Sequence, residues 1–173
     1  MTGMLDKAIE YAEMGWFVLP VQVKNKNPFT RFAKRGHWSA TDDIKVIESW
    51  WEEIPNLNVG IFCERSELIV LDVDFKRMGE EAWDYYMNKL PDTYVVATGF
   101  GMHFYYRITR GLWMPAQLCD GIDIKYRGYV VAPPSVHPNG YPYTSGPQSP
   151  HNDMAHVPNF ILELGDMDVT TLR

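Results

Sequence analysis

The chain has 173 residues, with 16 Lys and Arg against 22 Asp and Glu, and a formal net charge of -6. Hydrophobic residues make up 46% and charged residues 22%, which excludes a wholly disordered chain, and the acidic total argues against coating duplex DNA by charge alone. Two cysteines, Cys63 and Cys119, are too few for a disulfide scaffold and fit a reducing cytoplasm. With no secretion signal at the N-terminus and no apolar stretch of membrane-spanning length, we expect one cytoplasmic domain over residues 1–173, without a membrane partner.

Helical and strand-like segments alternate in the first part of the chain. Apolar residues at helical spacing predict a helix over residues 5–12 that ends at Gly15, and residues 16–23 are typical of a buried strand. Thr41 is the expected N-cap of a second helix, which ends at Pro55.

Basic and aromatic residues alternate in the loop between these segments, residues 24–40. No Asp or Glu occurs from residue 14 to residue 41, so we expect one positive region on a negative body. The candidate nucleic-acid-binding residues of this loop are Lys26, Arg31, Lys34, Arg35 and His37. A solvated surface loop is the alternative, because charged runs are often only solvated.

The remainder of the chain is richer in strands than in helices. Strands are predicted over residues 58–62, 68–75, 93–98, 103–108, 121–127, 129–132 and, at an edge, 141–144. Helices are predicted over residues 78–90 and 160–164, and Gly99-Phe100-Gly101 is typical of a hairpin. The sum is a mixed α and β domain with at least six strands.

Asp72 and Asp74 lie two residues apart at the end of an apolar strand. Side chains alternate across a sheet, so both carboxylates leave it on the same face. Such a pair repels itself unless a cation joins it, and Mg²⁺ or Mn²⁺ binds carboxylates while keeping positions open for water and phosphate. The alternative is a strand end with two solvated acids.

Asp123 begins a second polar segment, in which Lys125 and Arg127 share its face. Three carboxylates can hold two divalent ions, and neighbouring cations can neutralise phosphate oxygens. His103 follows a glycine-containing turn, where a histidine can donate to a phosphate, bind a metal or be satisfied within the turn. An exposed strand face with a cross-strand salt bridge is the alternative for Asp123 and its two cations.

In order and spacing these segments resemble the primase–polymerase (Prim-Pol) domain of the archaeo-eukaryotic primase superfamily, in the form found in plasmid and phage replication proteins. The central motifs are LDVD at 71–74, GMHFY at 101–105 and IDIK at 122–125, the last leading into residues 128–135. The resemblance implies an α+β fold, with an N-terminal α/β unit, an RRM-like antiparallel sheet and the active site in the cleft between them.

The resemblance also implies roles for particular residues. Asp72, Asp74 and Asp123 match catalytic acids that bind two Mg²⁺ or Mn²⁺ ions, and His103 matches a histidine that contacts the phosphates of the incoming nucleotide. Further nucleotide-binding candidates are Gly101, Lys125, Arg127 and Ser135, the last with a role in a turn as its alternative.

The implied activity is template-directed nucleotidyl transfer, by a DNA primase, a DNA polymerase or both. The implied partners are a single-stranded DNA template, a primer strand and dNTP or NTP, with a helicase domain in a longer phage- or plasmid-encoded polypeptide. No structural zinc is expected, because His137, His151 and His156 lack a matching cysteine pattern. A metal-dependent nuclease or phosphohydrolase, and a non-catalytic nucleic-acid-binding module, are the alternative functions.

Overall fold

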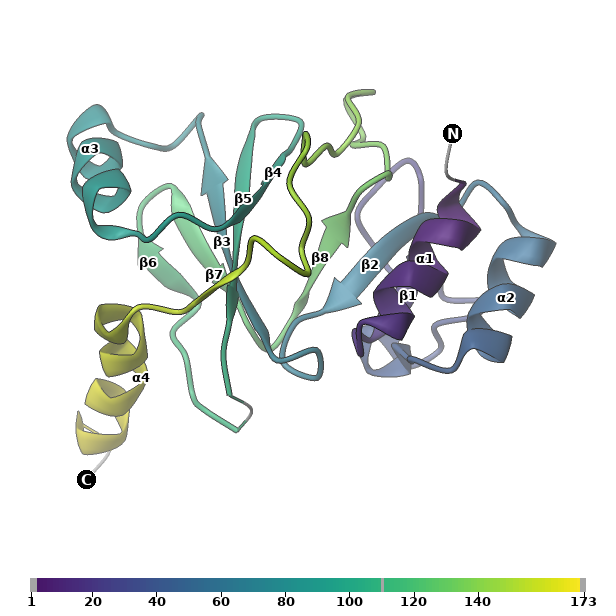
Figure 1. The fold of residues 1–173 in the computed structure, drawn as a ribbon, viewed down its shortest axis with the longest axis horizontal. Coiled ribbons are helices and arrows are strands. Elements are labelled where there is room, and N and C mark those ends of the chain that lie inside the picture. The colour runs from purple at the N-terminus through teal and green to yellow at the C-terminus, as the bar shows by residue number, and fades with distance from the viewer. Residues whose placement is uncertain (1–2, 110, 172–173) are drawn as a thin grey trace.

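A computed structural model describes residues 3–109 and 111–171, with side chains to residue 165. Its strands form two antiparallel sheets that lie against each other (Figure 1). The smaller sheet has the order β1-β2-β8 and consists of β1 (Val18–Val21), β2 (Asn58–Phe62) and β8 (Tyr129–Ala132). The helices α1 (Met4–Glu13) and α2 (Ile44–Glu53) lie beside it. These elements form the N-terminal unit.

The larger sheet has the order β4-β5-β3-β7-β6. Its strands are β3 (Leu68–Asp74), β4 (Tyr94–Ala97), β5 (Gly101–Arg107), β6 (Gln117–Cys119) and β7 (Ile122–Lys125), and the short β9 (Ala155–His156) pairs with β5 in parallel. The helices α3 (Glu80–Lys89) and α4 (Asn159–Thr171) contribute side chains to the core on one face of this sheet. The expected α+β class is therefore confirmed.

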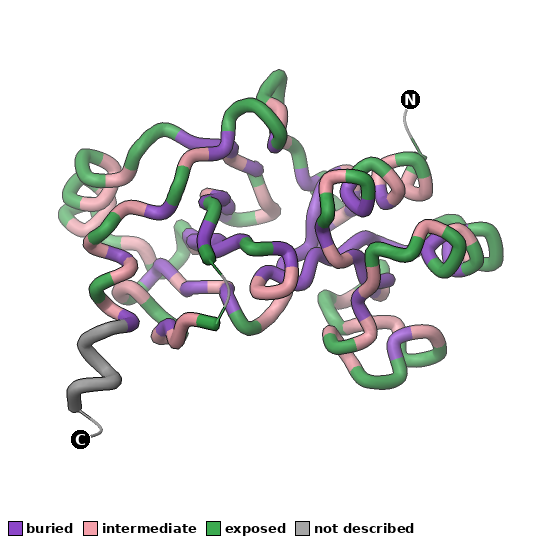
Figure 2. The backbone as a smooth tube through the Cα atoms, turned by 60° about the horizontal axis from the view of Figure 1, so that its bottom comes forward, coloured by how far each residue is buried: buried purple, intermediate pink, exposed green. Residues whose placement is uncertain are grey.

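Alternation along β3 divides its side chains between two environments. Ile69, Leu71 and Val73 are buried in the core that α3 and α4 cover. On the opposite face Leu68 and Val70 belong to the core shared with the smaller sheet, and the same face then ends in the two aspartates. Figure 2 shows the same pattern over the whole chain, with buried residues concentrated in the strands and exposed residues on the outer turns of the helices.

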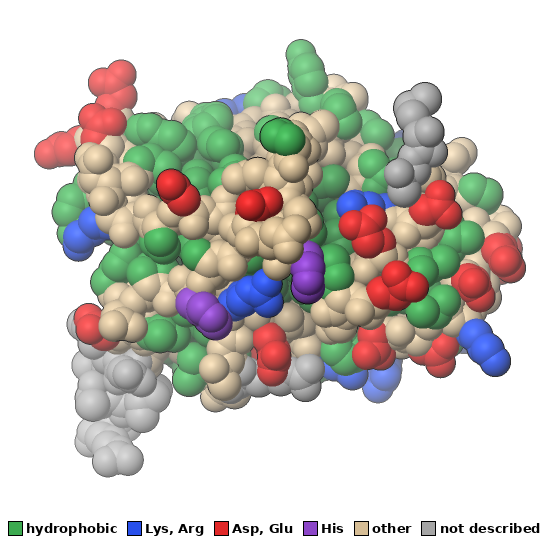
Figure 3. Space-filling view, in the orientation of Figure 1, with side chains coloured by type: hydrophobic (Ala, Val, Ile, Leu, Met, Phe, Trp, Pro, Cys, Tyr) green, Lys and Arg blue, Asp and Glu red, His purple; other side chains and the backbone are tan. Residues whose placement is uncertain are grey.

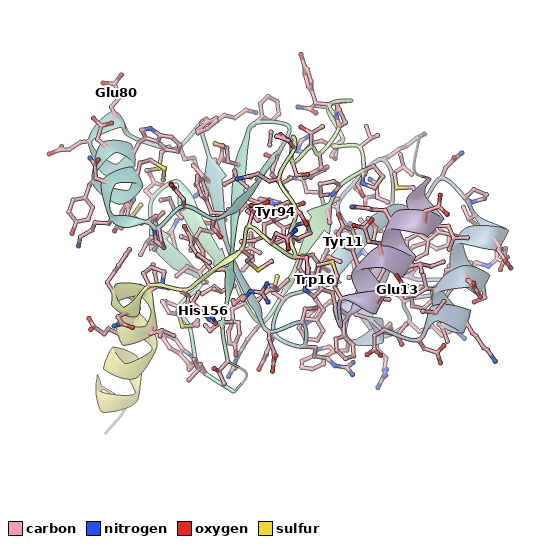
Figure 4. The ribbon with its side chains drawn as sticks, in the orientation of Figure 1. Tyr11, Glu13, Trp16, Glu80, Tyr94 and His156 are labelled. Atoms are coloured by element: carbon pink, nitrogen blue, oxygen red, sulfur yellow. The ribbon has the colours of Figure 1, made fainter. Side chains whose placement is uncertain are left out.

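Four aromatic side chains join the two sheets. Tyr11 stacks on Trp16 with ring centroids 5.3 Å apart, and Trp16 stacks on Tyr105 at 6.1 Å. Tyr94 packs edge-on against Tyr105 at 5.1 Å, and Figure 4 shows Tyr11, Trp16 and Tyr94 gathered where α1 meets β4. Each such pair contributes about 0.5–1.5 kcal/mol beyond its buried area, so this cluster fixes the N-terminal unit against the larger sheet.

The expected N-cap at Thr41 is wrong. Asp43 caps α2, because its carboxylate accepts hydrogen bonds from the backbone N–H groups of Lys45 and Val46. Thr41 lies three residues before the first residue of α2, and its carbonyl accepts a hydrogen bond from the N–H of Val18 and not from the helix.

The two strands expected around Gly128 belong to different sheets. The strand predicted over residues 121–127 is β7, which pairs with β3, and the strand predicted over residues 129–132 is β8, which pairs with β2 in the other sheet. Residues 141–144 form only isolated bridges, Val136 with Pro142 and Ala97 with Thr144, and not a strand. The short strands β6 and β9 carry too little pattern to be predicted. Among the described residues, no helix is long and apolar enough to cross a membrane.

Gly101 should be irreplaceable, because a Cβ at this position would overlap the carbonyl oxygen of Val73 on the neighbouring strand. We expect Gly101→Ala to lower the free energy of unfolding by about 3 kcal/mol, measured by urea denaturation. Gly128→Ala is the control, because a Cβ there would meet no atom within 4 Å. Equal stability of the two variants would contradict this packing.

Candidate active site

A cleft of about 620 Å³ lies between the two sheets. The larger sheet contributes polar side chains to one wall, from Asp72, Asp74, His103, Asp123 and Lys125. The opposite wall comes from β8 and from the loop between β1 and α2, which includes the short 3-10 helix η1 (Gly36–Ser39).

The strand register places three polar residues in one row across the sheet. Asp72 on β3 is the direct partner of His103 on β5 and, on its other side, of Asp123 on β7. Asp74 lies two residues further along the same face and is opposite Gly101. Asp123, which is distant in sequence, therefore lines one wall together with Asp72 and Asp74, each with about a third of its side chain exposed.

Asp72 and His103 interact directly. The Nε2 atom of His103 lies 3.4 Å from Oδ1 of Asp72, and the histidine is 6% exposed. Burial acts to raise the pKa of Asp72, but the hydrogen bond from His103 and the nearby positive charges outweigh it, so the pKa lies below its usual value. The other ring nitrogen of His103, Nδ1, is buried without a hydrogen-bond partner in the described structure.

Arg77 joins the other carboxylates of the site. Its guanidinium lies 3.1 Å from Asp74, 3.3 Å from Asp123 and 3.5 Å from Asp120. These contacts raise the pKa of Arg77, chiefly through its hydrogen bonds to Asp74 and Asp123. The guanidinium thus partly neutralises the acids of the cleft.

The donor chemistry of the cleft fits a divalent cation. Mg²⁺ commonly binds through one or two carboxylates and completes its shell with water and substrate phosphates, and Asp72 and Asp123 are adjacent on the sheet. As the side chains stand, no three His, Cys, Asp or Glu residues of the described chain are grouped closely enough to hold one ion. Asp74 and Asp123 instead share Arg77, which would have to leave one of them for both to bind a metal.

Only some of the candidate nucleic-acid-binding residues in the loop of residues 24–40 line the cleft. Lys26 and His37 line the cleft, and the carbonyl of Lys26 accepts a hydrogen bond of 2.6 Å from the hydroxyl of Tyr129 on β8. Arg31 forms an ion pair with Glu53 at the end of α2. Lys34 and Arg35 are exposed and are not among the residues that line the cleft.

Of the other nucleotide-binding candidates, only Lys125 lines the cleft. Its Nζ lies 3.8 Å from Asp123, whereas Arg127 follows the end of β7 and is exposed outside the lining. Ser135 is completely buried, and its hydroxyl contacts both the N–H and the carbonyl of Val59. Ser135 therefore has the structural role that was its alternative. The absence of a side chain at Gly101 allows β5 to lie close to β3.

Several lining residues were missed by sequence reasoning. Lys76, Arg77, His137 and Tyr143 all line the cleft. Lys76 and Arg77 follow Asp74 by two and three residues in the sequence, and two cations so close to two predicted metal ligands were a signal that could have been used. Tyr143 and His137 come from the irregular segment after β8, where no pattern indicates which side chains point inward.

Elsewhere on the surface the charge is mainly acidic. Figure 3 shows acidic side chains spread over α1 and α2 and, at the opposite end of the molecule, over α3. The cleft differs from these surfaces, because it combines its three aspartates with Lys26, Lys76, Arg77 and Lys125. A mixture of carboxylates and cations can bind metal ions and phosphate groups together.

Comparison with known proteins agrees with this chemistry. The family described as "Bifunctional DNA primase/polymerase, N-terminal" matches residues 8–160, a range that includes every strand of both sheets. A search among curated proteins finds no match.

Arg77 should compete with divalent cations for the acids of the cleft. We expect Arg77→Met to bind Mn²⁺ several-fold more tightly than the wild type, because its ion pairs with Asp74 and Asp123 must otherwise be broken. Electron paramagnetic resonance of free and bound Mn²⁺ measures this without any substrate.

Lys76→Met is the matched control for this experiment. It removes the same unit of charge from the adjacent residue, whose ammonium lies over the ring of Phe100. An equal gain in Mn²⁺ affinity in both variants would show that only the overall charge matters, and would contradict the role given to Arg77.

Proposed function

Because the chain belongs to the bifunctional DNA primase/polymerase family, we propose that the cleft transfers nucleotides from nucleoside triphosphates to a 3′-hydroxyl on a DNA template. The observation that supports this most directly is the row of Asp123, Asp72 and His103 across three adjacent strands. It puts two carboxylates beside a buried histidine, on a wall that also carries Lys125.

In this reaction the oxygen of the 3′-hydroxyl forms a bond to the α-phosphorus. The bond from that phosphorus to its bridging oxygen breaks, pyrophosphate leaves with the electron pair, and the hydroxyl loses its proton. Asp72, Asp74 and Asp123 would hold two Mg²⁺ or Mn²⁺ ions, which when bound lower the pKa of the hydroxyl and neutralise charge on the leaving group.

His103 is suited to bind a phosphate of the incoming nucleotide. Asp72 orients the ring through Nε2, and Nδ1, which has no partner in the described protein, becomes a donor when the ring is protonated; because Nδ1 is buried, a phosphate would reach it only after a shift of the side chains around it. A buried donor held in place before the reaction loses little free energy to reorganisation, which is why preorganised donors are effective. Lys125 supplies a second positive charge on the same wall.

The template strand would pass along the wall formed by the N-terminal unit. Lys26 and His37 line the cleft there. Lys26 would contact the phosphate backbone of the strand and the ring of His37 would stack on a base, a combination that binds single strands with little sequence preference. A helicase region of a longer polypeptide would supply such a single strand.

Removal of one acid should stop synthesis. We expect Asp72→Ala and Asp123→Ala each to slow primer extension by about a hundredfold or more, because the remaining carboxylates cannot hold the ions in place. Product length on a primed single-stranded template, with Mg²⁺ or Mn²⁺, measures the effect. Asp84→Ala, at an exposed position of α3, should extend primers at the wild-type rate.

The same assay separates the alternative functions. A metal-dependent nuclease would shorten the labelled strand when nucleotides are omitted, whereas a polymerase leaves it intact. Wild-type extension by the Asp72→Ala variant would contradict the assignment of the metal ligands. Binding of DNA with neither extension nor cleavage would favour the non-catalytic module.

His103→Ala should act mainly on nucleotide binding. We expect the affinity for a nucleoside triphosphate to fall by about tenfold or more, because a charged phosphate loses one buried donor. Isothermal titration with and without metal measures it, and His151→Ala, at an exposed position outside the cleft lining, is the control. An unchanged affinity in the His103 variant would remove this residue from the phosphate site.

A further inference from the structure

Phe100 occupies the tip of the hairpin between β4 and β5, at the edge of the cleft. Its side chain is 45% exposed, although single exposed apolar residues are common and need no explanation by themselves. Phe100 differs from such residues in how firmly its backbone is held. Its carbonyl accepts a hydrogen bond of 3.0 Å from the N–H of Phe75, and the N–H of Thr98 donates to Gly101 across the turn at 2.9 Å.

The glycines on either side of Phe100 allow the hairpin to pack closely. A Cβ at Gly99 would lie 2.5 Å from the ring of His137, and one at Gly101 would overlap the carbonyl of Val73. The side-chain amide of Asn139 also donates to the carbonyl of Gly99 at 3.2 Å. Phe100 is therefore the one residue of this tripeptide with a side chain, and it projects from a rigid support.

A cation accompanies the aromatic ring. The Nζ atom of Lys76 lies 3.6 Å from the centroid of the Phe100 ring, and the ring of His137 lies perpendicular to it with a centroid distance of 5.7 Å. The ammonium group lies over one face of the ring, which leaves the other face as the stacking surface. The pair matches the two parts of a nucleotide, because a base stacks on an aromatic ring and a phosphate pairs with a cation.

The position of this pair relates it to the acids. Gly101, the residue after Phe100, is the cross-strand partner of Asp74. One residue of extended strand spans about 3.4 Å, so the backbone of Phe100 lies one residue from the partner of Asp74, and Phe100 and Lys76 line the same cleft as the aspartates. The large exposed fraction of Phe100 leaves room for a chain that continues into solvent, which a strand does and a single enclosed nucleotide does not.

We propose that Phe100 and Lys76 form a subsite for one base and one phosphate of the single-stranded nucleic acid that enters the cleft. The inference rests on the proposed nucleotidyl transfer and assigns a place in it to the exposed aromatic residue of the β4–β5 hairpin. Phe100 supplies the stacking surface, and Lys76 supplies the charge.

The affinity of the whole chain for a fluorescently labelled oligo(dT) tests this, measured by anisotropy in Mg²⁺ without nucleotides. We expect Phe100→Ala to bind about tenfold more weakly, and Phe100→Tyr to bind like the wild type because it keeps the ring. Phe75→Ala is the matched control, since Phe75 is 52% exposed but packs edge-on against Trp83 and does not line the cleft.

The salt dependence of the affinity separates the two components. The slope of log affinity against log salt should be unchanged in Phe100→Ala, because stacking releases no counterions. It should become shallower by about 0.7 in Lys76→Met, the value for one phosphate contact on a single strand.

Wild-type binding by Phe100→Ala, or equal weakening in Phe75→Ala, would overturn the subsite. Weaker binding of free dNTP by Phe100→Ala, with unchanged binding of oligo(dT), would overturn its assignment to the strand. If the wild type itself fails to bind oligo(dT), or shortens it, the proposed function fails, and that result is distinct from a failure of Phe100 alone.

Discussion

Strand β3 lies between β5 and β7 in the larger sheet, so each of its side chains must face either the helical core or the smaller sheet. The alternating side chains of this seven-residue strand suit both faces. Ile69, Leu71 and Val73 bury apolar surface in the helical core, and Asp72 and Asp74 on the other face line the cleft. The carboxylates are thus held by a strand that cannot shift its register without moving its apolar side chains into the cleft. Rigid positioning of this kind is what a catalytic constellation needs.

The charges of the cleft depend on one another. Three carboxylates on one wall would repel each other, and the structure offsets this with Arg77 between two of them and His103 beside the third. Burial acts to raise the pKa of Asp72, but the hydrogen bond from His103 and the neighbouring positive charges lower it below its usual value. The ionised form of Asp72 is thereby favoured, which is the state that binds a hard cation.

Strand limits and side-chain faces could be predicted from the sequence where a single local rule determines them. The limits of β2 and β8 agree with the expected ones, since short apolar runs between turn residues have few alternatives. The sequence also predicted that Asp72 and Asp74 share a face, which follows from the two-residue period alone.

Long-range pairing could not be predicted in the same way. The sequence does not indicate that Gly128 separates two sheets, because the partners of β7 and β8 lie 49 to 73 residues away along the chain. The position of Arg77 depends on how the connection after β3 folds back toward Asp123, and the contact of Ser135 with Val59 likewise joins residues that are remote in sequence. Contacts of this kind arise from the tertiary fold and leave no periodic pattern.

The link between the two sheets has a consequence for how the cleft can change its width. Residues 63–67 connect β2 to β3 and residues 126–128 connect β7 to β8, and the two connections are bonded to each other, with Cys63 N–H donating to the carbonyl of Gly128 at 3.0 Å. Two short connections at one place form a hinge between the facing walls. A rotation about this hinge that widens the cleft must work against the stacked rings of Trp16 and Tyr105, which join the two sheets.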